Sequence, residues 1–243
     1  MQHLSPSATP LIVSEGADWL VVDKPAHLLI HPTRPDGQFT LLEWLRQQRV
    51  GEFIAIVNRL DRETSGLVLV ARSPSAASRL GKMTMRREIG KKYLAIVSGK
   101  TPERGVIEAP LGRVGGAVHI RQGVMAGGYP AVTRFARLEV KHAADGRAFS
   151  FLEVELETGR LHQIRVHLSH SGHPVCGDKI YGPDEQCYLE FIENGWTPAL
   201  AEKLLLNRHA LHAAALTFIW NEKPVNASAP LPEDLRSFWG SLT

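Results

Sequence analysis

The sequence has little of several features that mark common protein classes. It contains only two cysteines, Cys176 and Cys187, which favours reduced thiols in a cytoplasmic protein over a disulfide scaffold. It has no run of about 18 apolar residues, so no transmembrane span is expected. The N-terminus lacks a positively charged start followed by an apolar core, so it is not typical of a signal peptide. We therefore expect a cytoplasmic protein that does not enter a membrane.

Familiar catalytic signatures are also missing. Neither glycine-rich phosphate-binding pattern occurs, which argues against the common nucleotide-hydrolysing and dinucleotide enzymes, and there is no G-x-S-x-G nucleophile elbow. Histidines do cluster, at His162, His167, His170 and His173. The first three are separated by five and then three residues, which does not place them on one helix face, and no acid is interleaved among them. No metal site is therefore expected.

What is present suits one globular protein with an anionic partner. The 243 residues, 44% of them hydrophobic, are enough for one large domain or two small subdomains that share a cleft. We expect a flexible tail over 1–10 and one folded domain over 11–243. The net charge is +3, and basic residues gather at Arg86, Arg87, Lys91 and Lys92. This cluster fits a polyanion, although a solvated charged face would have the same composition.

The most informative stretch is Asn58 to Gly66, a polar segment between apolar runs at 54–57 and 67–71. The pattern predicts a turn between two strands, with Gly66 in a backbone conformation that other residues avoid. Asp61 in such a turn should be partly desolvated, so its charge needs a cation or hydrogen-bond donors. Arg59 and Arg62 are near in sequence, and Arg160 or Arg165 could come from elsewhere. A carboxylate held in this way can act as a nucleophile or base, or it can simply brace the turn.

The remaining pattern predicts an α+β protein with a largely antiparallel or mixed sheet. Helices are expected from Thr40, where Glu43 completes a capping box and Gly51 is the expected terminator, and from Ser73-Pro74. Residues 161–168 could alternate as a strand, but a helix is preferred because Leu161, Ile164 and Leu168 recur at helical spacing, and a further helix is expected over 184–207. Loops are expected over 26–39 and 177–183, and strands over 18–24, 93–97, 106–111, 117–121, 131–140, 150–157 and 211–220, the last being the final strand before a short polar C-terminus. Tyr93, at a strand start, could stack on a base or belong to the core.

Five ordered blocks of this sequence resemble the RluA family of pseudouridine synthases. The central block, Asn58-Arg59-Leu60-Asp61-x-x-Thr64-Ser65-Gly66, is similar to the family signature His-Arg-Leu-Asp-x-x-Thr-Ser-Gly. The others are the opening block from Val21 to Pro32, Lys92-Tyr93-Leu94-Ala95, the long block from Thr158 to Gly182, and Leu211-His212-Ala213. The resemblance runs from about residue 11 to about residue 232.

The resemblance implies a central mixed, mainly antiparallel sheet with flanking helices and an RNA-binding cleft. It implies isomerisation of uridine to pseudouridine in ribosomal or transfer RNA, without a cofactor, by a monomer that needs no protein partner. Asp61 corresponds to the catalytic aspartate, Tyr93 to the tyrosine that stacks on the target base, and Arg165 to the arginine that pairs with the aspartate. Arg59 corresponds to the arginine that holds the flipped-out nucleotide. Asn58, Arg62, Lys92, Arg160 and His162 complete the expected RNA-binding set.

Two departures from the family pattern bear on function. Asn58 stands where the family usually has His, and we expect it to support the loop or contact RNA without abolishing activity. The sequence also enters the first catalytic strand almost at once, so we expect no S4 RNA-binding domain ahead of it. Two other functions stay open: an RNA-binding protein that keeps the fold without catalysis, and a nucleosidase that uses Asp61 to release free uracil.

Overall fold

The computed structural model describes residues 8–32 and 39–243, so most of the tail expected over 1–10 and residues 33–38 of the loop expected over 26–39 lie outside the described residues. The chain divides into two compact units. Residues 8–91 and 213–230 form the unit that contains Asp61, called here the Asp61 unit. Residues 92–212 and 231–243 form the unit that contains Arg165, called the Arg165 unit.

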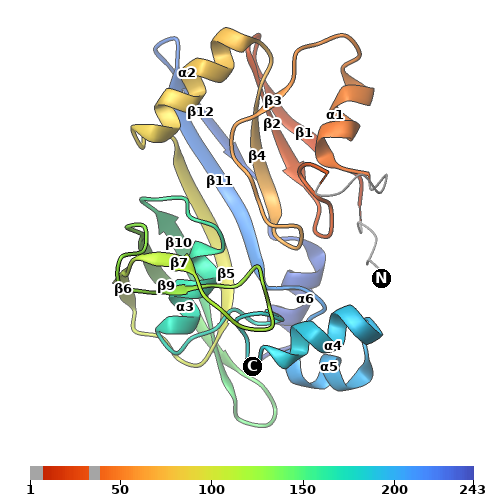
Figure 1. Ribbon diagram of the computed structural model, residues 1–243, viewed down its shortest axis with the longest axis vertical. Coiled ribbons are helices and arrows are strands. Elements are labelled where there is room, and N and C mark those ends of the chain that lie inside the picture. Colours follow the sequence, from red (N-terminus) through yellow and green to blue (C-terminus); the bar gives the residue numbers. More distant parts are fainter. Residues whose placement is uncertain (1–7, 33–38) are drawn as a thin grey trace. The chain divides into compact units, whose positions relative to one another are not determined.

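The Asp61 unit is built on a sheet with the strand order β1-β2-β4-β11-β12 (Figure 1). Its strands are β1 (Leu11–Glu15), β2 (Trp19–Lys24), β3 (Ala55–Ile56), β4 (Ser65–Ala71), β12 (Lys223–Ser228) and most of β11 (Leu211–Trp220). The short strand β3 pairs with β4, and the pairs β1–β2, β2–β4, β3–β4 and β11–β12 are antiparallel. Every residue of β4 is buried, so this strand is the centre of the unit.

The helix α2 (Pro74–Met85) covers one face of this sheet (Figure 1). Its buried positions Ala76, Leu80 and Met83 pack into a core with residues from β2, β4 and β11. That core comprises Trp19, Val21, Leu67, Leu69, Ala71, Ile89, Leu216, Phe218, Trp220, Ala227 and Ala229. Burial of each large apolar side chain stabilises the fold by about 1.5–3 kcal/mol, so α2 is held firmly in one orientation.

The helix starts follow local chemistry. Helix α1 (Leu41–Gln48) begins at Thr40, whose hydroxyl accepts from the Glu43 amide while the Glu43 carboxylate accepts from the Thr40 amide, so the expected capping box is confirmed. Helix α2 begins at Ser73, whose hydroxyl accepts from the Ala76 amide, with proline at the first helical position. The end predicted for α1 is wrong, because the helix stops at Gln48 and Gly51 (φ +79°) lies in the following turn.

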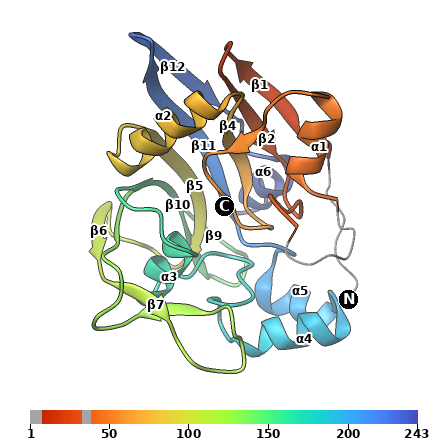
Figure 2. The same cartoon turned by 45° about the horizontal axis from the view of Figure 1, so that its top comes forward.

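The Arg165 unit has its own antiparallel strands in the order β5-β10-β9-β6. They are β5 (Gly90–Ser98, which begins in the Asp61 unit), β10 (Ala148–Leu156), β9 (Val132–His142) and β6 (Arg104–Glu108). A separate two-stranded sheet pairs β7 (Leu111–Arg113) with β8 (Gln122–Val124). The helices are α3 (Gln163–His170), α4 (Gln186–Asn194), α5 (Pro198–Leu204) and α6 (Glu233–Gly240). Helices α4 and α5 lie side by side and pack through Cys187, Phe191, Trp196, Leu200 and Leu204 (Figure 2).

The α+β class and the mainly antiparallel strands are confirmed, while several element boundaries are corrected. The strand expected over 106–111 is two strands, β6 and β7, and residues 117–121 form no strand because the extended segment begins only at Gln122. The helix expected over 184–207 is two helices, since Gly195 ends α4 with a φ of +74°. The strand 211–220 is confirmed but is not the last element, because β12 and α6 follow it.

Candidate active site

Asn58 fastens the loop that carries Asp61 to the neighbouring strand. Its amide nitrogen donates to the Leu67 carbonyl at 3.3 Å, and its amide oxygen accepts from the Leu69 backbone N–H at 2.7 Å. The side chain is buried, and both ends of the amide are used inside the protein. The contacts of Asn58 therefore indicate that its side chain stabilises the loop.

A buried lysine ties the same loop to the end of β2. The Lys24 side chain is fully buried, and its ammonium group donates to the carbonyls of Pro25 and Leu28 at 2.9 Å each and of Arg62 at 3.1 Å. Three carbonyl acceptors offset much of the cost of burying the charge. The half-buried Arg62 in turn donates from Nε to the His27 carbonyl at 3.2 Å, and burial lowers its pKa. Arg62 is thus anchored within the loop scaffold.

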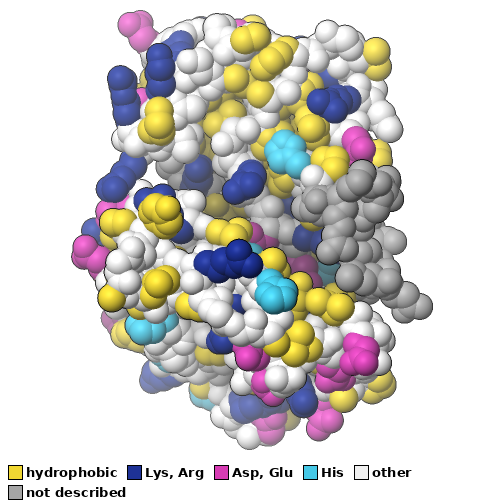
Figure 3. All heavy atoms as spheres, viewed as in Figure 1, with side chains coloured by type: hydrophobic (Ala, Val, Ile, Leu, Met, Phe, Trp, Pro, Cys, Tyr) yellow, Lys and Arg dark blue, Asp and Glu magenta, His cyan; other side chains and the backbone are white. Residues whose placement is uncertain are grey.

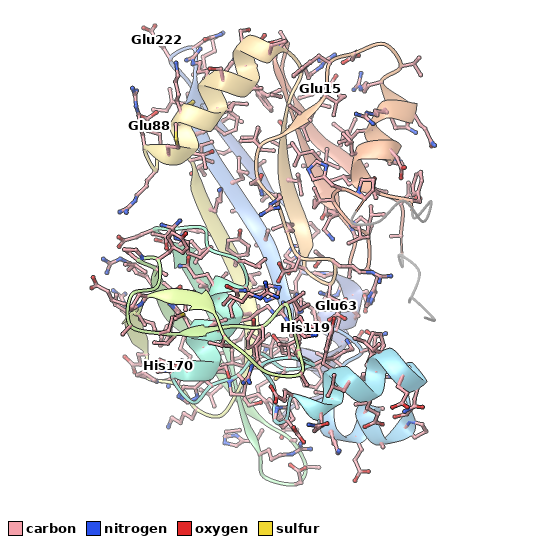
Figure 4. All side chains as sticks on the ribbon, viewed as in Figure 1. Glu15, Glu63, Glu88, His119, His170 and Glu222 are labelled. Carbon is pink, nitrogen blue, oxygen red and sulfur yellow. The ribbon has the colours of Figure 1, made fainter. Side chains whose placement is uncertain are left out.

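Asp61 lies in a tight turn of this loop. The Thr64 amide donates to the Asp61 carbonyl at 3.1 Å, and Thr64 and Ser65 are buried while Asp61 stays partly exposed. Gly66 ends the turn with a φ of +107°, and a Cβ there would lie 2.3 Å from the Ala213 carbonyl oxygen. The predicted need for glycine at position 66 is confirmed, and Figure 4 shows the loop, with Glu63 labelled, at the end of β4. The backbone thus holds Asp61 within reach of solvent.

Arg59 belongs to the same loop and has an exposed side chain. Burial and then the positive charges of Arg59 and Arg46 lower the pKa of His31. The Arg59 side chain therefore lies close enough to His31, in the block from Val21 to Pro32, for their charges to interact. Arg59 is available at the surface of the Asp61 unit for contact with an anionic ligand.

In the Arg165 unit, Arg165 is held by a carboxylate that sequence reasoning had not assigned. Its Nε donates to Oδ2 of Asp178 at 2.6 Å, and its Nη2 donates to Oδ1 at 2.9 Å. Asp178 is fully buried and also accepts from the backbone amides of Ile180 and Tyr181 at 3.0 Å each. Burial alone would raise the pKa of Asp178, but Arg165, the charge of His209 and the Tyr181 amide lower it to about 2. Both members of the pair are charged, and the two-point contact fixes the orientation of the Arg165 guanidinium.

The segment before α3 is fixed by its own hydrogen bonds. The preferred helical reading of this segment is confirmed, but α3 starts two residues later than predicted because His162 adopts a φ of +58°, and Leu161 is exposed rather than part of an apolar face. His162 contacts the Tyr181 hydroxyl through Nδ1 at 2.8 Å. Arg160 is exposed, donates from Nε to the Pro130 carbonyl at 3.2 Å and lies 5.4 Å from the ring centre of Tyr129. These contacts orient the segment that leads to Arg165.

The two expected site residues on β5 have different environments. Tyr93 is 7% exposed and lies opposite Val154 of β10. Lys92 is exposed and forms ion pairs with Glu153 at 2.8 Å and Glu155 at 3.2 Å, and hydrogen bonds to these carboxylates raise its pKa. Two carboxylates already balance the charge of Lys92, which weakens the case for it as a phosphate ligand.

The structure thus groups the expected residues within each unit. Asn58, Arg59, Asp61 and Arg62 share one loop of the Asp61 unit. In the Arg165 unit, Arg160 and His162 precede α3, Arg165 lies on it, and Lys92 and Tyr93 share β5. Sequence reasoning missed the roles of Lys24 and Asp178. Both stand in the blocks that resemble the family, beside Pro25 and after Gly177, but no spacing rule indicates their distant partners.

The described residues, 8–32 and 39–243, contain neither a metal-ligand cluster nor a membrane-spanning helix. No three side chains among His, Cys, Asp and Glu gather there in a way that could hold a metal ion. None of the helices in those ranges combines the length and the apolar character needed to cross a bilayer. The two cysteines form no disulfide, as the sequence predicted, and both are buried.

The carboxylate in a turn beside β4 lies where the sequence predicted it, whereas the buried carboxylate of Asp178 that holds Arg165 was not predicted. Residues 18–170 match the RNA pseudouridylate synthase family. The chain belongs to this family of isomerases, which confirms the resemblance seen in the sequence.

Among its relatives is ribosomal large subunit pseudouridine synthase D of Xanthomonas campestris pv. campestris, 36% identical over 99% of this chain and 72% of the relative. The enzyme of the same name from Nitrosomonas europaea is 36% identical over 94% of this chain and 64% of the relative. Human RNA pseudouridylate synthase domain containing 1 is a similar solved structure, with a TM-score of 0.75, 27% identity, and coverage of 99% of this chain and 91% of that one.

Proposed function

We propose that this protein isomerises specific uridines of large-subunit ribosomal RNA to pseudouridine, with Asp61 as the group that acts on the nucleotide. The observation that carries the proposal is the construction of the Asp61 loop. Contacts of Asn58, Lys24 and Gly66 fix its backbone, while the Asp61 side chain stays partly exposed. A carboxylate held in advance loses little freedom when a reaction begins, which is how positioning lowers a barrier.

The target base must leave its stack before it can be turned over, which costs a few kcal/mol. The bond from C1′ to N1 then breaks, the uracil rotates, and C5 bonds to C1′. N1 gains a proton and C5 loses one, so atoms and electrons balance without a redox step or an added group. Asp61 can attack C1′, add to C6 of the ring, or remove the 2′ proton to give a glycal. All three routes release the C5 proton to water.

The other residues have supporting roles in this proposal. Tyr93 would stack on the base and limit where the freed uracil can move. Arg165 would keep the Asp61 carboxylate ionised, while the Asp178 carboxylate would hold the Arg165 guanidinium in one orientation. Arg59 would hold the flipped-out nucleotide. Arg62, Arg160 and His162 are anchored within the protein and would shape the RNA-binding surface.

The choice of ribosomal RNA rests on the names of the relatives, and the reduced cysteines support a cytoplasmic site of action. We propose that the chain acts as a monomer. The test is to map pseudouridines in ribosomal and transfer RNA from cells that lack the protein, and again after they receive wild-type protein or the Asp61→Asn variant. One or more sites in large-subunit RNA should disappear and return only with wild type. An unchanged map, or changes confined to transfer RNA, would contradict the proposed substrate.

A further inference from the structure

The segment from Ser73, the N-cap of α2, to Arg87 has no acidic residue and four exposed cations. Three of them follow the helical repeat, Arg79 and Lys82 within α2 and Arg86 at its C-cap, while Arg87 leaves the helix with a φ of +60°. Successive members of this set are three and four residues apart. Residues at these spacings share one face of a helix, so the three cations form a single stripe, called here the α2 basic face. The stripe is about 10 Å long, the distance over which one strand of a nucleic-acid duplex carries about three phosphates.

The opposite face of the helix fixes which way this stripe points. Ala76, Leu80 and Met83 are buried in the core of the Asp61 unit, so α2 cannot rotate without exposing them. Figure 3 shows Lys and Arg side chains gathered over α2, at the upper left of the view. Burial of the opposite face therefore keeps the α2 basic face exposed to solvent.

Arg79 is also immobilised. Its guanidinium lies 4.1 Å from the centre of the Trp220 ring, and its Nη1 donates to Oδ1 of Asn221 at 2.6 Å. Neither contact cancels the charge of Arg79, since an aromatic face and an amide oxygen are both neutral. The result is a cation ordered in advance, which lowers the entropy lost when it meets an anion.

Ordinary helix electrostatics explain only part of this arrangement. Lys82 and Arg86 lie at the C-terminal end of α2, where the helix dipole favours cations. Arg79 is in the middle of the helix, and like charges three or four residues apart cost a few tenths of a kcal/mol per pair. The two nearby acids, Glu88 and Glu222, are exposed, and Glu88 lies 3.9 Å from Arg86, too far and too wet to cancel much of its charge (Figure 4). Uncompensated repulsion of this kind is relieved by an anionic partner.

We propose that the α2 basic face binds phosphates of the substrate RNA away from the target nucleotide. This inference rests on the proposed function, because RNA is the polyanion that such an enzyme must hold. The face has no contact with the Asp61 loop among its described hydrogen bonds and ion pairs. Its cations would therefore contribute to RNA affinity and leave the chemical step alone.

The test compares the double variant Lys82→Glu/Arg86→Glu with a matched control, Lys100→Glu/Arg104→Glu. Both pairs are exposed and both changes remove the same charge, but the control pair lies in the Arg165 unit. Arg79 is left unchanged because its packing on Trp220 makes its loss a risk to stability. RNA affinity is measured at several KCl concentrations with an unmodified transcript of a large-subunit ribosomal RNA fragment, and kcat and KM are measured by tritium release from the same RNA.

In the Lys82/Arg86 variant we expect about a tenfold loss of affinity at 0.15 M salt and a salt slope smaller by about 1.5 than in wild type. KM should rise with kcat unchanged, and the control should stay close to wild type. An unchanged slope and KM in the Lys82/Arg86 variant, or an equal loss in the control, would overturn the inference. An unchanged slope and KM are also the result expected if an acidic protein, rather than RNA, occupied this face. If wild type binds the RNA but releases no tritium, the proposed function fails, while the affinity and slope comparison still decides the role of the α2 basic face.

Discussion

Arg165 and Asp178 meet end to end inside the Arg165 unit, with Nε and Nη2 of the guanidinium bound to the two carboxylate oxygens at 2.6 and 2.9 Å. Both side chains are buried, and the carboxylate also accepts two backbone amide hydrogen bonds. Asp178 thus fixes the orientation of Arg165, the arginine that we assign to the reaction. We propose that Asp178 influences the reaction only through Arg165, as a positioning residue.

We predict that Asp178→Asn lowers both stability and turnover. Removing one charge of a buried pair leaves the other uncompensated, which costs about 3–5 kcal/mol. A guanidinium displaced by about 1 Å should also lower kcat about 100-fold at saturating RNA. Urea unfolding and single-turnover tritium release measure the two effects.

The matched control is Asp234→Asn, because Asp234 forms the same two-point pair with the buried Arg208, at 2.5 and 3.0 Å in the same unit. This variant should lose stability but keep its turnover at a temperature where it stays folded. Equal loss of kcat in the two variants, or wild-type kcat in Asp178→Asn, would contradict a positioning role for Asp178.

The same pair predicts how stability changes in acid. The pKa of Asp178 is lowered from 3.8 to about 2 in the folded protein, so in that range the unfolded chain binds more protons. The ionised Asp178 carboxylate therefore adds about 2 kcal/mol to the free energy of unfolding above about pH 4, and this contribution is lost as the pH falls toward 2. Urea unfolding of wild type and Asp178→Asn from pH 2 to 6 measures it. The difference in free energy of unfolding between them should shrink at low pH, and a difference independent of pH would refute this account.

Asn58 should be replaceable by a residue that keeps its two hydrogen bonds, and not by one that loses them. Asn58→Ala leaves the buried Leu69 amide without its acceptor, which costs about 1–3 kcal/mol. Asn58→His restores the residue usual in the RluA family and retains a donor and an acceptor. Its turnover should stay within severalfold of wild type in the tritium assay, and a drastic change would show that Asn58 does more than support the loop.

Gly66 should tolerate no side chain. Gly66→Ala would place a Cβ 2.3 Å from the Ala213 carbonyl oxygen at a φ of +107°, and we expect a loss of about 3 kcal/mol in the free energy of unfolding. Gly81→Ala is the control, because Gly81 lies inside α2 with nothing within 4 Å of an added Cβ. That change should stabilise the protein by about 0.5–1 kcal/mol. Equal thermal shifts in the two variants would contradict the close approach at Gly66.

Local chemistry made the helix starts and the Asp61 turn predictable. The caps at Thr40 and Ser73 depend on side chains within three residues of the backbone groups they satisfy, so the sequence contains the whole interaction. Gly66 was predictable for the same reason, because a turn between two apolar runs needs an unusual backbone angle. The family resemblance added the fold class and the order of the blocks.

Interactions between distant residues were not predictable in this way. The apparent alternation over 117–121 forms no strand, because strand formation depends on a partner that the local pattern does not name. Arg165 and Asp178 are thirteen residues apart and meet only because α3 folds back against the loop that follows it. Lys24 reaches Arg62 across 38 residues, so its role as a loop support could not be read from composition or spacing.

The central claim is that Asp61 carries out the isomerisation, and tritium release from RNA labelled at C5 of uridine tests it most directly. Wild type should release tritium in proportion to the pseudouridine formed, with no free uracil. Asp61→Asn should bind the same RNA, unfold at a similar urea concentration and release no tritium above the background without enzyme. Wild-type release by Asp61→Asn would contradict the account.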